Sequence, residues 1–279
     1  MFRLLTTCLV AVLAAAAHAH ELDMGEVRYI ANAGVLASDN RTQIMFDPLF
    51  RNTFDRYDPV ADDVRAKMFG GISPFVSVDA VFISHHHEDH FDPADLLELL
   101  VRQPQVHLYA PEQAADAIRR LLDASRATVE SRIHGVALAL DDPATKITVG
   151  RLEIEALRVP HAGYPERHGD VENIVFRVTL DEHMTVMHLG DADTVDGHFA
   201  VQPDFWTDRL TDVAFPPYWF FLNEEGRVIV ENRLNTRRAI GVHVPANMPN
   251  DPDKRPDELR GFELFTRPTE ARTVDLRAP

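Results

Sequence analysis

A mostly apolar run followed at once by a cluster of metal-binding residue types restricts the fold of this chain more than any other feature. Residues 78–84 (VDAVFIS) are typical of a strand that is buried on both faces. Residues 85–90 (HHHEDH) follow directly and contain four histidines. Side chains at the end of a buried strand project into a turn, where functional groups commonly lie. We therefore expect a chemically active site at the end of this strand.

The spacing within the cluster predicts where its side chains point. His85 and His87 are two residues apart, so in an extended segment both imidazoles lie on one side. Asp89 and His90 come after the chain bends and can face a second point close by. Neutral imidazole and carboxylate oxygen suit Zn²⁺, and also Mn²⁺ or Fe²⁺. A solvated histidine-rich turn or an adventitious metal site is the alternative, but histidine is a rare residue, so the density of the cluster favours a metal centre.

The apolar pattern along the rest of the chain predicts groups of short strands separated by helices. Strands are expected at residues 26–36, 43–46, 78–84, 107–110, 146–149, 152–159, 173–180, 184–189, 212–215, 241–244 and 262–265. Helices are expected at 93–100, 111–124 and 233–240. The irregular stretch at 49–77 is long for a connection, so it is either a functional loop or a loosely packed insertion. Two sheets packed face to face with helices outside satisfy this pattern, which predicts one α/β domain over residues 20–279 with a four-layer αββα sandwich.

The N-terminus has the pattern of a secretory signal peptide over residues 1–19. One positive charge at Arg3 precedes an apolar run at 4–17, and residues 17–19 (AHA) match the small-x-small pattern that signal peptidase cuts. The run is too short for a stable membrane span, so we expect cleavage, no stable membrane insertion afterwards, and a periplasmic or secreted mature protein. The single cysteine, Cys8, lies in this segment. The mature protein is therefore predicted to lack disulfides, thiolate metal ligands and a cysteine nucleophile.

The formal net charge of −16 restricts the partners of the chain. A nucleic acid would be repelled, because binding it depends on neutralising its phosphates with lysine and arginine. We therefore expect a small-molecule substrate and no nucleic-acid partner.

The HHHEDH cluster fits the HxHxDH signature of the metallo-β-lactamase superfamily, and its position after VDAVFIS resembles that superfamily closely. Three later residues resemble the remaining ligands of the superfamily in their expected order. His161 lies in RVPHAG, Asp191 in HLGDAD and His243 in GVHVP. The resemblance covers residues 26–265 and implies the αββα fold.

The resemblance also implies a dinuclear metal centre. Three histidines would hold the first divalent ion: His85, His87 and His161. An aspartate and two histidines would hold the second: Asp89, His90 and His243. Asp191 would bridge the two ions, for which zinc is favoured over manganese or iron. A water shared between two cations is acidified toward neutral pH and would serve as a hydroxide nucleophile, with Asp89 acting as a catalytic residue as well as a ligand.

Other residues compete for roles in this site. The rival histidines are His168, His183, His188 and His198. His198 is the strongest of them, because it lies shortly after Asp191 and could be a substrate contact or a proton donor; it is our second candidate catalytic residue. Residues 218–221 (YWFF), together with the aromatic residues of 49–77, could form an apolar lid over the substrate or belong to the core.

Within the superfamily, the chain looks most like the branch that contains ascorbate-6-phosphate lactonase and N-acylphosphatidylethanolamine phospholipase D. The likeness lies in HFDPADLLEL after the motif, and in the turn at Gly190-Asp191 with the segments 197–199 and 212–216 that follow it. It implies hydrolysis of an ester, a lactone or a phosphodiester. The alternatives are a β-lactam hydrolase of the same fold and a non-catalytic periplasmic metal-binding protein. An arginine near the site would favour a phosphate-bearing substrate, but the sequence alone places neither Arg167 nor Arg227.

Overall fold

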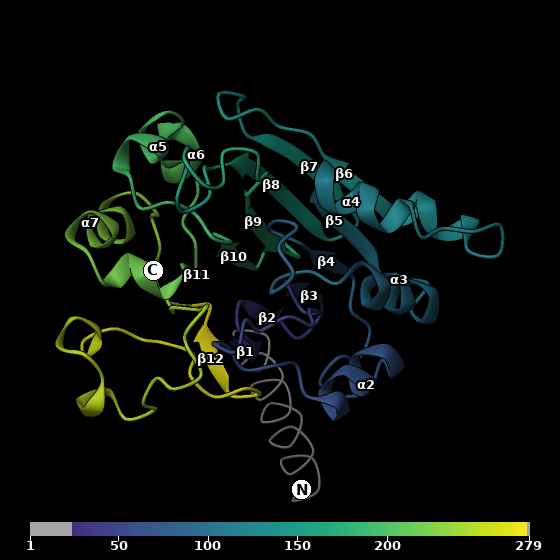
Figure 1. The fold of residues 1–279 in the computed structure, drawn as a ribbon, viewed down its shortest axis with the longest axis horizontal. Helices are drawn as coiled ribbons and strands as arrows, with labels where there is room; N and C mark the ends of the chain where they lie inside the picture. Colours follow the sequence, from purple (N-terminus) through teal and green to yellow (C-terminus); the bar gives the residue numbers. More distant parts are fainter. Residues whose placement is uncertain (1–23, 278–279) are drawn as a thin grey trace, which may run out of the picture.

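The computed structural model of the protein describes residues 24–277. The predicted signal peptide at 1–19, with Cys8, lies outside the described residues. Two β-sheets occupy the middle of the molecule, and helices flank them on both sides (Figure 1). Over residues 24–277, no helix is both long enough and apolar enough to cross a membrane.

Within the described residues, the first sheet has seven strands and the second has five. The strands of the first sheet, in spatial order, are β12 (Ala271–Asp275), β1 (Met24–Ala31), β2 (Gly34–Ser38), β3 (Gln43–Phe46), β4 (Ala80–Phe82), β5 (His107–Pro111) and β6 (Ile133–Val136). They pair antiparallel from β12 to β3 and parallel from β3 to β6. The strands of the second sheet are β11 (Val213–Phe215), β10 (Met184–His188), β9 (Ile174–Leu180), β8 (Leu152–Arg158) and β7 (Thr145–Val149). They pair antiparallel except for β10 and β11.

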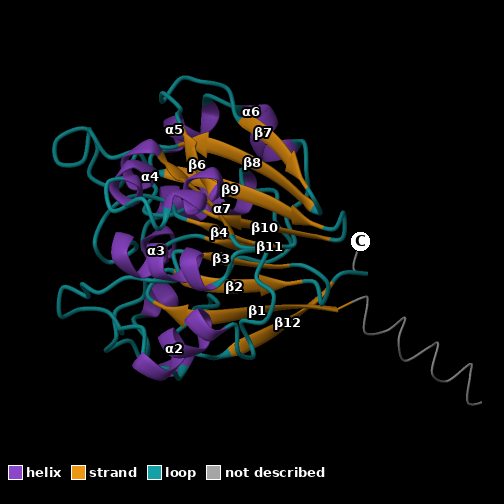
Figure 2. Ribbon diagram, turned by 90° about the vertical axis from the view of Figure 1, so that its right-hand side faces the viewer, coloured by secondary structure: helices purple, strands orange, loops and turns teal. Residues whose placement is uncertain are grey.

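The sheets pack face to face, and their strands run in roughly the same direction (Figure 2). Apolar side chains from both sheets, such as Val27, Phe82 and Phe176, fill the space between them. The outer face of the first sheet packs against α2 (Asp62–Gly70), α3 (Pro93–Arg102) and α4 (Glu112–Arg119). The outer face of the second sheet packs against α5 (Asp196–Ala200), α6 (Pro203–Thr207), α7 (Glu224–Asn232) and the 3-10 helix η2 (Tyr218–Phe221). This order of layers confirms the predicted αββα sandwich.

Short 3-10 helices complete the described secondary structure. They are η1 (Ala127–Arg132), η3 (Pro252–Lys254) and η4 (Asp257–Leu259). The first of them leads into β6, and the other two lie in the long segment between the last predicted ligand, His243, and β12.

The local sequence explains why β4 and α3 form where they do. Ala80 and Phe82 of β4 face the second sheet, whereas Val81 faces the helices, so the strand is buried on both sides as its apolar sequence predicts. Asp92 caps α3 by accepting a hydrogen bond from the backbone N–H of Asp95 (2.8 Å). The predicted start of this helix is confirmed, and the helix begins directly after the HHHEDH motif.

The prediction of one strand over 26–36 is wrong, because the chain turns back within it. β1 and β2 form an antiparallel pair whose register shifts between Tyr29 and Ala31. Asn32 sits in the turn with a φ of 49°, a left-handed conformation that asparagine adopts more readily than most residues. Apolar residues continue through this turn in the sequence, so the apolar pattern alone does not reveal it.

The stretch at 49–77 is less irregular than predicted, since α2 occupies Asp62–Gly70. Phe50 and Phe75 are buried in the core against this helix, so this part of the stretch is well packed. Phe54, in contrast, is 58% exposed. The helix places few apolar residues on its buried face, which explains why no helical periodicity marks it in the sequence.

The predictions for the C-terminal part are wrong in two places. A helix was expected at 233–240, but the helix of this region is α7, whose N-cap Asn223 accepts a hydrogen bond from the backbone N–H of Gly226 (2.7 Å). Residues 233–240 instead form isolated bridges that extend the second sheet. The edge strand of the first sheet is β12 rather than residues 262–265.

Candidate metal centre

The ends of several strands bring the predicted metal-binding residues to one edge of the sandwich. β3 and β4 are parallel neighbours, so Asp47 after β3 and His85 after β4 lie at the same edge. β8 and β10 both run antiparallel to β9, so His161 after β8 and Asp191 after β10 reach one edge of the second sheet. His243 follows an isolated bridge beyond the end of β11. The topology therefore gathers residues that lie far apart in the sequence.

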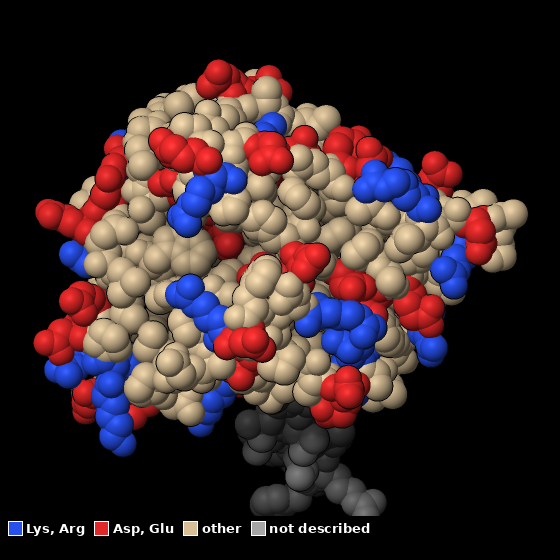
Figure 3. All heavy atoms as spheres, in the orientation of Figure 1, with Lys and Arg blue, Asp and Glu red and all other residues tan. Residues whose placement is uncertain are grey.

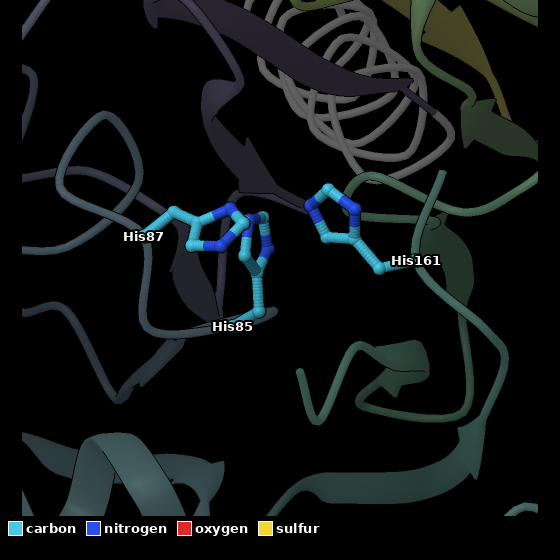
Figure 4. Close-up of side chains that lie close together, drawn as sticks. All are labelled: His85, His87 and His161. Atoms are coloured by element: carbon cyan, nitrogen blue, oxygen red, sulfur yellow. The ribbon is translucent and has the colours of Figure 1, made fainter. Parts of the chain in front are cut away.

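His85, His87 and His161 form the first cluster, and Figure 4 shows their imidazoles close together. One nitrogen from each ring lies within 4.8 Å of the other two. The Nε2 of His85 is 3.2 Å from the Nδ1 of His87. The Nδ1 of His161 is 2.8 Å from the carbonyl oxygen of Ala162, and the Nδ1 of His85 is 3.0 Å from the hydroxyl of Ser84. The contacts with Ser84 and Ala162 occupy the Nδ1 atoms of His85 and His161, so Nε2 is the nitrogen with which these two rings can bind a metal.

Asp89, His90 and His243 form the second cluster, whose ligand atoms also lie within 4.8 Å of one another. The Nε2 of His243 is 3.1 Å from Oδ2 of Asp89, and the Nε2 of His90 is 3.9 Å from the same oxygen. All three side chains are buried. The second cluster thus offers two imidazoles and a carboxylate to one point.

Asp191 lies between the two clusters. Its Oδ2 is 3.5 Å from the Nε2 of His161 in the first cluster. Its Oδ1 is 3.1 Å from the Nε2 of His90 and 3.4 Å from the Nε2 of His243 in the second cluster. One carboxylate therefore presents an oxygen to each cluster, as a bridging ligand must.

Several buried polar atoms of the centre have no hydrogen-bond partner within the described residues. They are the Nε2 atoms of His90, His161 and His243, and Oδ1 of Asp191. A buried polar atom without a partner is rare, because its desolvation costs about 1–3 kcal/mol. Imidazole nitrogen and carboxylate oxygen are ligands of zinc and other divalent transition metals. The unpartnered atoms therefore fit divalent metal ions.

The charges of the site favour a cation. Burial lowers the pKa of His87 to about 4 and holds the pKa of His85 well below its usual value, so both rings are neutral and able to bind a metal. Burial alone would raise the pKa of Asp191, but the charges of His243 and His90 hold it well below its usual range. Burial would also lower the pKa of His90, yet the neighbouring carboxylates raise it well above its usual value. The negative field that holds a proton on His90 is the field that attracts a divalent cation.

Asp47 is a buried carboxylate behind the clusters that the sequence motifs do not reveal. Its Oδ2 is 2.8 Å from the Nδ1 of His90 and accepts a hydrogen bond from the hydroxyl of Ser84 (2.6 Å). Its Oδ1 accepts a hydrogen bond from the backbone N–H of Ser84 (2.7 Å). A carboxylate behind a ligating histidine fixes the orientation of the ring and raises its basicity. The available signal was the position of Asp47 after a strand that runs parallel to β4.

The turn that presents Asp191 depends on a glycine and two buried polar side chains. Gly190 has a φ of 57°, and a Cβ at this position would lie 2.2 Å from Oδ1 of Asn173, so only glycine fits. Asn173 accepts a hydrogen bond from the backbone N–H of Asp191 (3.0 Å). His188 accepts one from the N–H of Gly190 (3.1 Å), and its Nε2 is 2.9 Å from the carbonyl oxygen of Ala33. His188 thus supports the turn instead of joining the clusters.

Asn32 connects the two loops that carry the second cluster. Its side-chain amide donates to the backbone carbonyl of Asp89 (2.8 Å), and its backbone carbonyl accepts a hydrogen bond from the backbone N–H of His243 (2.7 Å). His243 has a φ of 58°, which for a residue with a side chain costs on the order of 1–3 kcal/mol and persists where the surroundings enforce it. Tyr57 and Trp219 pack against its ring, with centroids 4.3 Å and 5.2 Å away. Neither Asn32 nor Tyr57 carries a sequence signal for this role.

A cavity of about 700 Å³ opens onto both clusters. Besides members of the clusters, its described walls include Phe54, Arg56, Tyr57 and His168. His168 packs beside the first cluster, with its ring centroid 4.6 Å from that of His161. The face of the molecule in Figure 3 is hollowed near its centre, where a carboxylate lies deep among uncharged atoms. The volume is within the range of small-molecule sites, roughly 300–1,000 Å³.

The structure does not place His198 among the described residues that line this cavity. His198 lies on α5 beside a separate, smaller cavity, where its ring contacts Tyr164 (centroids 5.8 Å apart). Of the aromatic residues at 218–221, Phe220 and Phe221 are buried in the core, whereas Trp219 contacts His243. The segment therefore packs against the ligand His243 and the core, and it does not form a lid.

Comparison with known proteins shows the family. A family model described as "Beta-lactamase superfamily domain" matches residues 42–244, which is most of the chain. The chain belongs to this superfamily. Its membership and the His/Asp clusters place the protein among the metal-dependent hydrolases of the superfamily and support the binding of divalent metal.

Individual relatives are distant. The chain is 26% identical to Protein Rv0786c of Mycobacterium tuberculosis over 253 residues, which cover 90% of this chain and 95% of that protein. It is 24% identical to a ribonuclease Z of Thermococcus kodakarensis over 170 residues, which cover 57% of this chain and 52% of that protein. Among solved structures, it is similar to Igni18, a metallo hydrolase from Ignicoccus hospitalis, with a TM-score of 0.58, 15% identity, and coverage of 90% of this chain and 98% of that one. This structural similarity supports the fold.

Proposed function

We propose that the protein is an exported hydrolase that binds two divalent metal ions and cleaves an ester, a lactone or a phosphodiester of a small molecule. The observation that carries the dinuclear proposal is the position of Asp191, whose two oxygens face different clusters. Zinc is favoured by the imidazole and carboxylate ligands, with manganese and iron as alternatives. The choice of bonds follows from the resemblance to the branch with ascorbate-6-phosphate lactonase and N-acylphosphatidylethanolamine phospholipase D.

The residues of the centre form two sets of ligands, one for each ion. The first ion would be held by three histidines: His85, His87 and His161. The second would be held by an aspartate and two histidines: Asp89, His90 and His243. When bound, the two ions would supply an acidified water as the nucleophile and would polarise the carbonyl or phosphoryl group whose carbon or phosphorus is attacked.

The surrounding side chains orient the ligands and hold the charge of the site. Asp47 and Ser84 keep the Nε2 atoms of His90 and His85 directed into the centre. Burial would raise the pKa of Asp89, but the charge of His90 and the imidazole of His243, whose Nε2 lies 3.1 Å from Oδ2 of Asp89, lower it overall, so Asp89 is ionised at neutral pH. Because Asp89 also lines the cavity, it is the carboxylate that we propose as proton acceptor during the attack.

A small-molecule substrate suits both the shape and the charge of the protein. The cavity has the volume of a small-molecule site, and the chain has a formal net charge of −16. On the face shown in Figure 3, lysine and arginine side chains occur in separate small groups among acidic ones. A nucleic acid is bound mainly by lysine and arginine side chains that neutralise its phosphates and release their counterions. Cleavage of RNA, which the name of the archaeal relative describes, is therefore not our proposal for this chain.

The export part of the proposal rests on the sequence of residues 1–19. Cleavage after Ala19 would leave His20 as the first residue of the mature protein. N-terminal sequencing of protein from the periplasmic and medium fractions of a producing cell tests this. Retention of the first 19 residues in a cytosolic fraction would contradict export.

The hydrolase proposal is tested by metal analysis combined with a substrate panel. The purified protein is loaded separately with Zn²⁺, Mn²⁺ and Fe²⁺, freed of excess metal, and analysed by mass spectrometry of its metals. Each form is then assayed with bis-p-nitrophenyl phosphate, an acyl-homoserine lactone, a thioester and a chromogenic cephalosporin. We expect two metal equivalents and turnover of the phosphodiester or the lactone.

The other outcomes each have a defined meaning. A single metal equivalent would contradict the dinuclear centre. Two equivalents without turnover of any substrate would support a metal-binding protein instead of an enzyme. Turnover of the cephalosporin alone would identify a β-lactam hydrolase.

A further inference from the structure

Arg56 differs in charge from the other residues that line the cavity at the metal centre. It is the only lysine or arginine among the described residues that line the cavity, whose other charged groups include Glu88 and Asp191. The sequence analysis considered Arg167 and Arg227 for such a position, but neither lines this cavity in the described part of the chain. A single fixed cation in an acidic protein therefore faces the space that a substrate must occupy.

The guanidinium of Arg56 forms no ion pair with the described residues. Over residues 24–277, no carboxylate oxygen lies within 4.0 Å of its nitrogens, although other arginines at the surface, such as Arg51 and Arg233, are paired with aspartates. Its hydrogen-bond partner is the neutral hydroxyl of Tyr218, which accepts from Nη2 at 2.8 Å. A guanidinium with free N–H groups is a strong donor to carboxylate and phosphate oxygens.

The guanidinium is held in place before any ligand arrives. Besides the hydrogen bond to Tyr218, it lies over the ring of Tyr57, with the guanidinium carbon 5.5 Å from the ring centroid. The backbone carbonyl of Arg56 accepts a hydrogen bond from the N–H of Ala246 (2.9 Å), close to His243. Less side-chain entropy is lost on binding when a donor is already oriented, so these contacts favour ligand recognition.

The loop that carries Arg56 is tied to the metal motif. The side-chain amide of Asn52 donates to the carboxylate of Glu88 (2.8 Å), and the backbone N–H of Asn52 donates to the carbonyl of Glu88 (3.3 Å). Phe54 and Asp55 have φ values of 49° and 52°, a costly pair of left-handed conformations that these contacts maintain. The loop thereby places the exposed ring of Phe54 in the wall of the cavity that Arg56 also lines.

We propose that Arg56 is the specificity-determining residue of the site and binds an anionic group of the substrate, a carboxylate or a phosphate, while the metal centre binds the bond to be cleaved. Phe54 supplies apolar surface to the part of the substrate between these two points. This inference deepens the proposed function and rests on it for the metal centre. It limits the substrates to small molecules that carry a negative charge at a distance from the scissile bond.

Equilibrium binding tests the proposal without requiring turnover. Isothermal titration of the zinc-loaded protein compares straight-chain dicarboxylates of three to six carbons with their monomethyl esters. One carboxylate of each ligand can reach the metals, and only the diacid has a second charge for Arg56. We expect a diacid of matching length to bind about tenfold more tightly than its monoester, the effect of one charge-assisted hydrogen-bonded contact. In Arg56→Gln this preference should disappear, and in Arg56→Lys it should persist in part.

Two controls separate recognition from structural effects. Arg120→Gln removes an equal charge at the end of α4, outside the cavity lining, and should keep the preference of the wild type. Phosphonate analogues of the same diacids distinguish the two anions, since the anion that loses more affinity in Arg56→Gln is the one that the site recognises. The proposal is overturned if no diacid is preferred by the wild type, or if Arg56→Gln weakens diacids and monoesters equally. Turnover in the substrate panel without any diacid preference would leave the hydrolase proposal standing and remove this one.

Discussion

The protein contains two groups of closely packed histidines at opposite ends of the strands of the first sheet. One group is the whole metal centre, at the ends of β3 and β4. The other is a pair at the starts of β5 and β6, where the Nδ1 of His107 lies 2.9 Å from the Nε2 of His134. The ring of Tyr109 stacks on His134 at a centroid distance of 4.7 Å. In both places, imidazole nitrogens lie within 4.8 Å of one another.

The charges around the metal centre and around the His107–His134 pair differ in sign. At the metal centre, Asp191 and its neighbours raise the pKa of His90 against the effect of burial. At the other pair, burial lowers the pKa of His107 and the nearby Arg132 lowers it further. Within the described residues, sets of three or more potential ligands occur only at the metal centre. The comparison teaches that a group of histidines becomes a cation site where a third ligand and nearby carboxylates, such as Asp191, join it, whereas two imidazoles beside an arginine do not.

The largest effect is expected from removing the bridging carboxylate. Asp191→Asn keeps the shape of the side chain but removes the negative charge shared by both clusters, so metal retention and turnover should fall by about 100-fold or more. Metal content after dialysis and kcat/KM measure the two losses. Asp193→Asn, on the same turn, is the matched control and should retain metal. Full metal retention in Asp191→Asn would show that the clusters bind ions without a bridge.

A smaller effect is expected behind the ligands. Asp47→Asn preserves the left-handed backbone, which asparagine tolerates, but removes the charge that faces the Nδ1 of His90. Metal affinity should fall by about 10- to 100-fold, as is typical of partners that orient a ligand. Competition with a chromogenic chelator measures the affinity. Unchanged affinity would mean that Ser84 and the packing orient His90 unaided.

The smallest effect is expected at the second histidine pair. His134→Gln should leave the metal content unchanged and alter the free energy of unfolding by about 1 kcal/mol or less, the scale of one hydrogen bond. Urea titration and metal analysis test both statements. A loss of metal from this variant would show that the His107–His134 pair also contributes to metal binding, which would contradict the contrast with the metal centre.

The same variant should also change how stability depends on pH. Burial lowers the pKa of His134, with His107 and Arg119 lowering it further. The unfolded chain therefore binds a proton as the pH falls through about 6.5, while the folded protein does not, so stability decreases on acidification. His134→Gln removes one such group, and its free energy of unfolding should fall less steeply between pH 6.5 and 5. Equal slopes for the variant and the wild type would contradict the role of burial.

Much of the site could be predicted from the sequence because its ligands have rare residue types in a dense motif. His85, His87, Asp89 and His90 follow one buried strand, and their arrangement is local. The layers of the fold were also predictable, because the spacing of apolar residues indicates groups of strands separated by helices. The turn at Asn32 could not be predicted, because apolar residues continue through it in the sequence. The helix α2 could not be predicted either, because it has too few apolar residues to show a helical spacing.

The sequence by itself determined that a metal-binding cluster follows a strand buried between two layers, because composition and periodicity are local properties of the chain. Only the tertiary structure decided which distant groups complete that cluster. Asp47 stands behind His90, Asp191 faces both clusters, and Arg56 enters the cavity, because parallel strand ends and one tethered loop meet at a single edge. His198 follows Asp191 by seven residues, yet it lies on α5 beside a separate, smaller cavity. Distance along the chain does not fix distance in space, since the pairing of strands decides which ends come together.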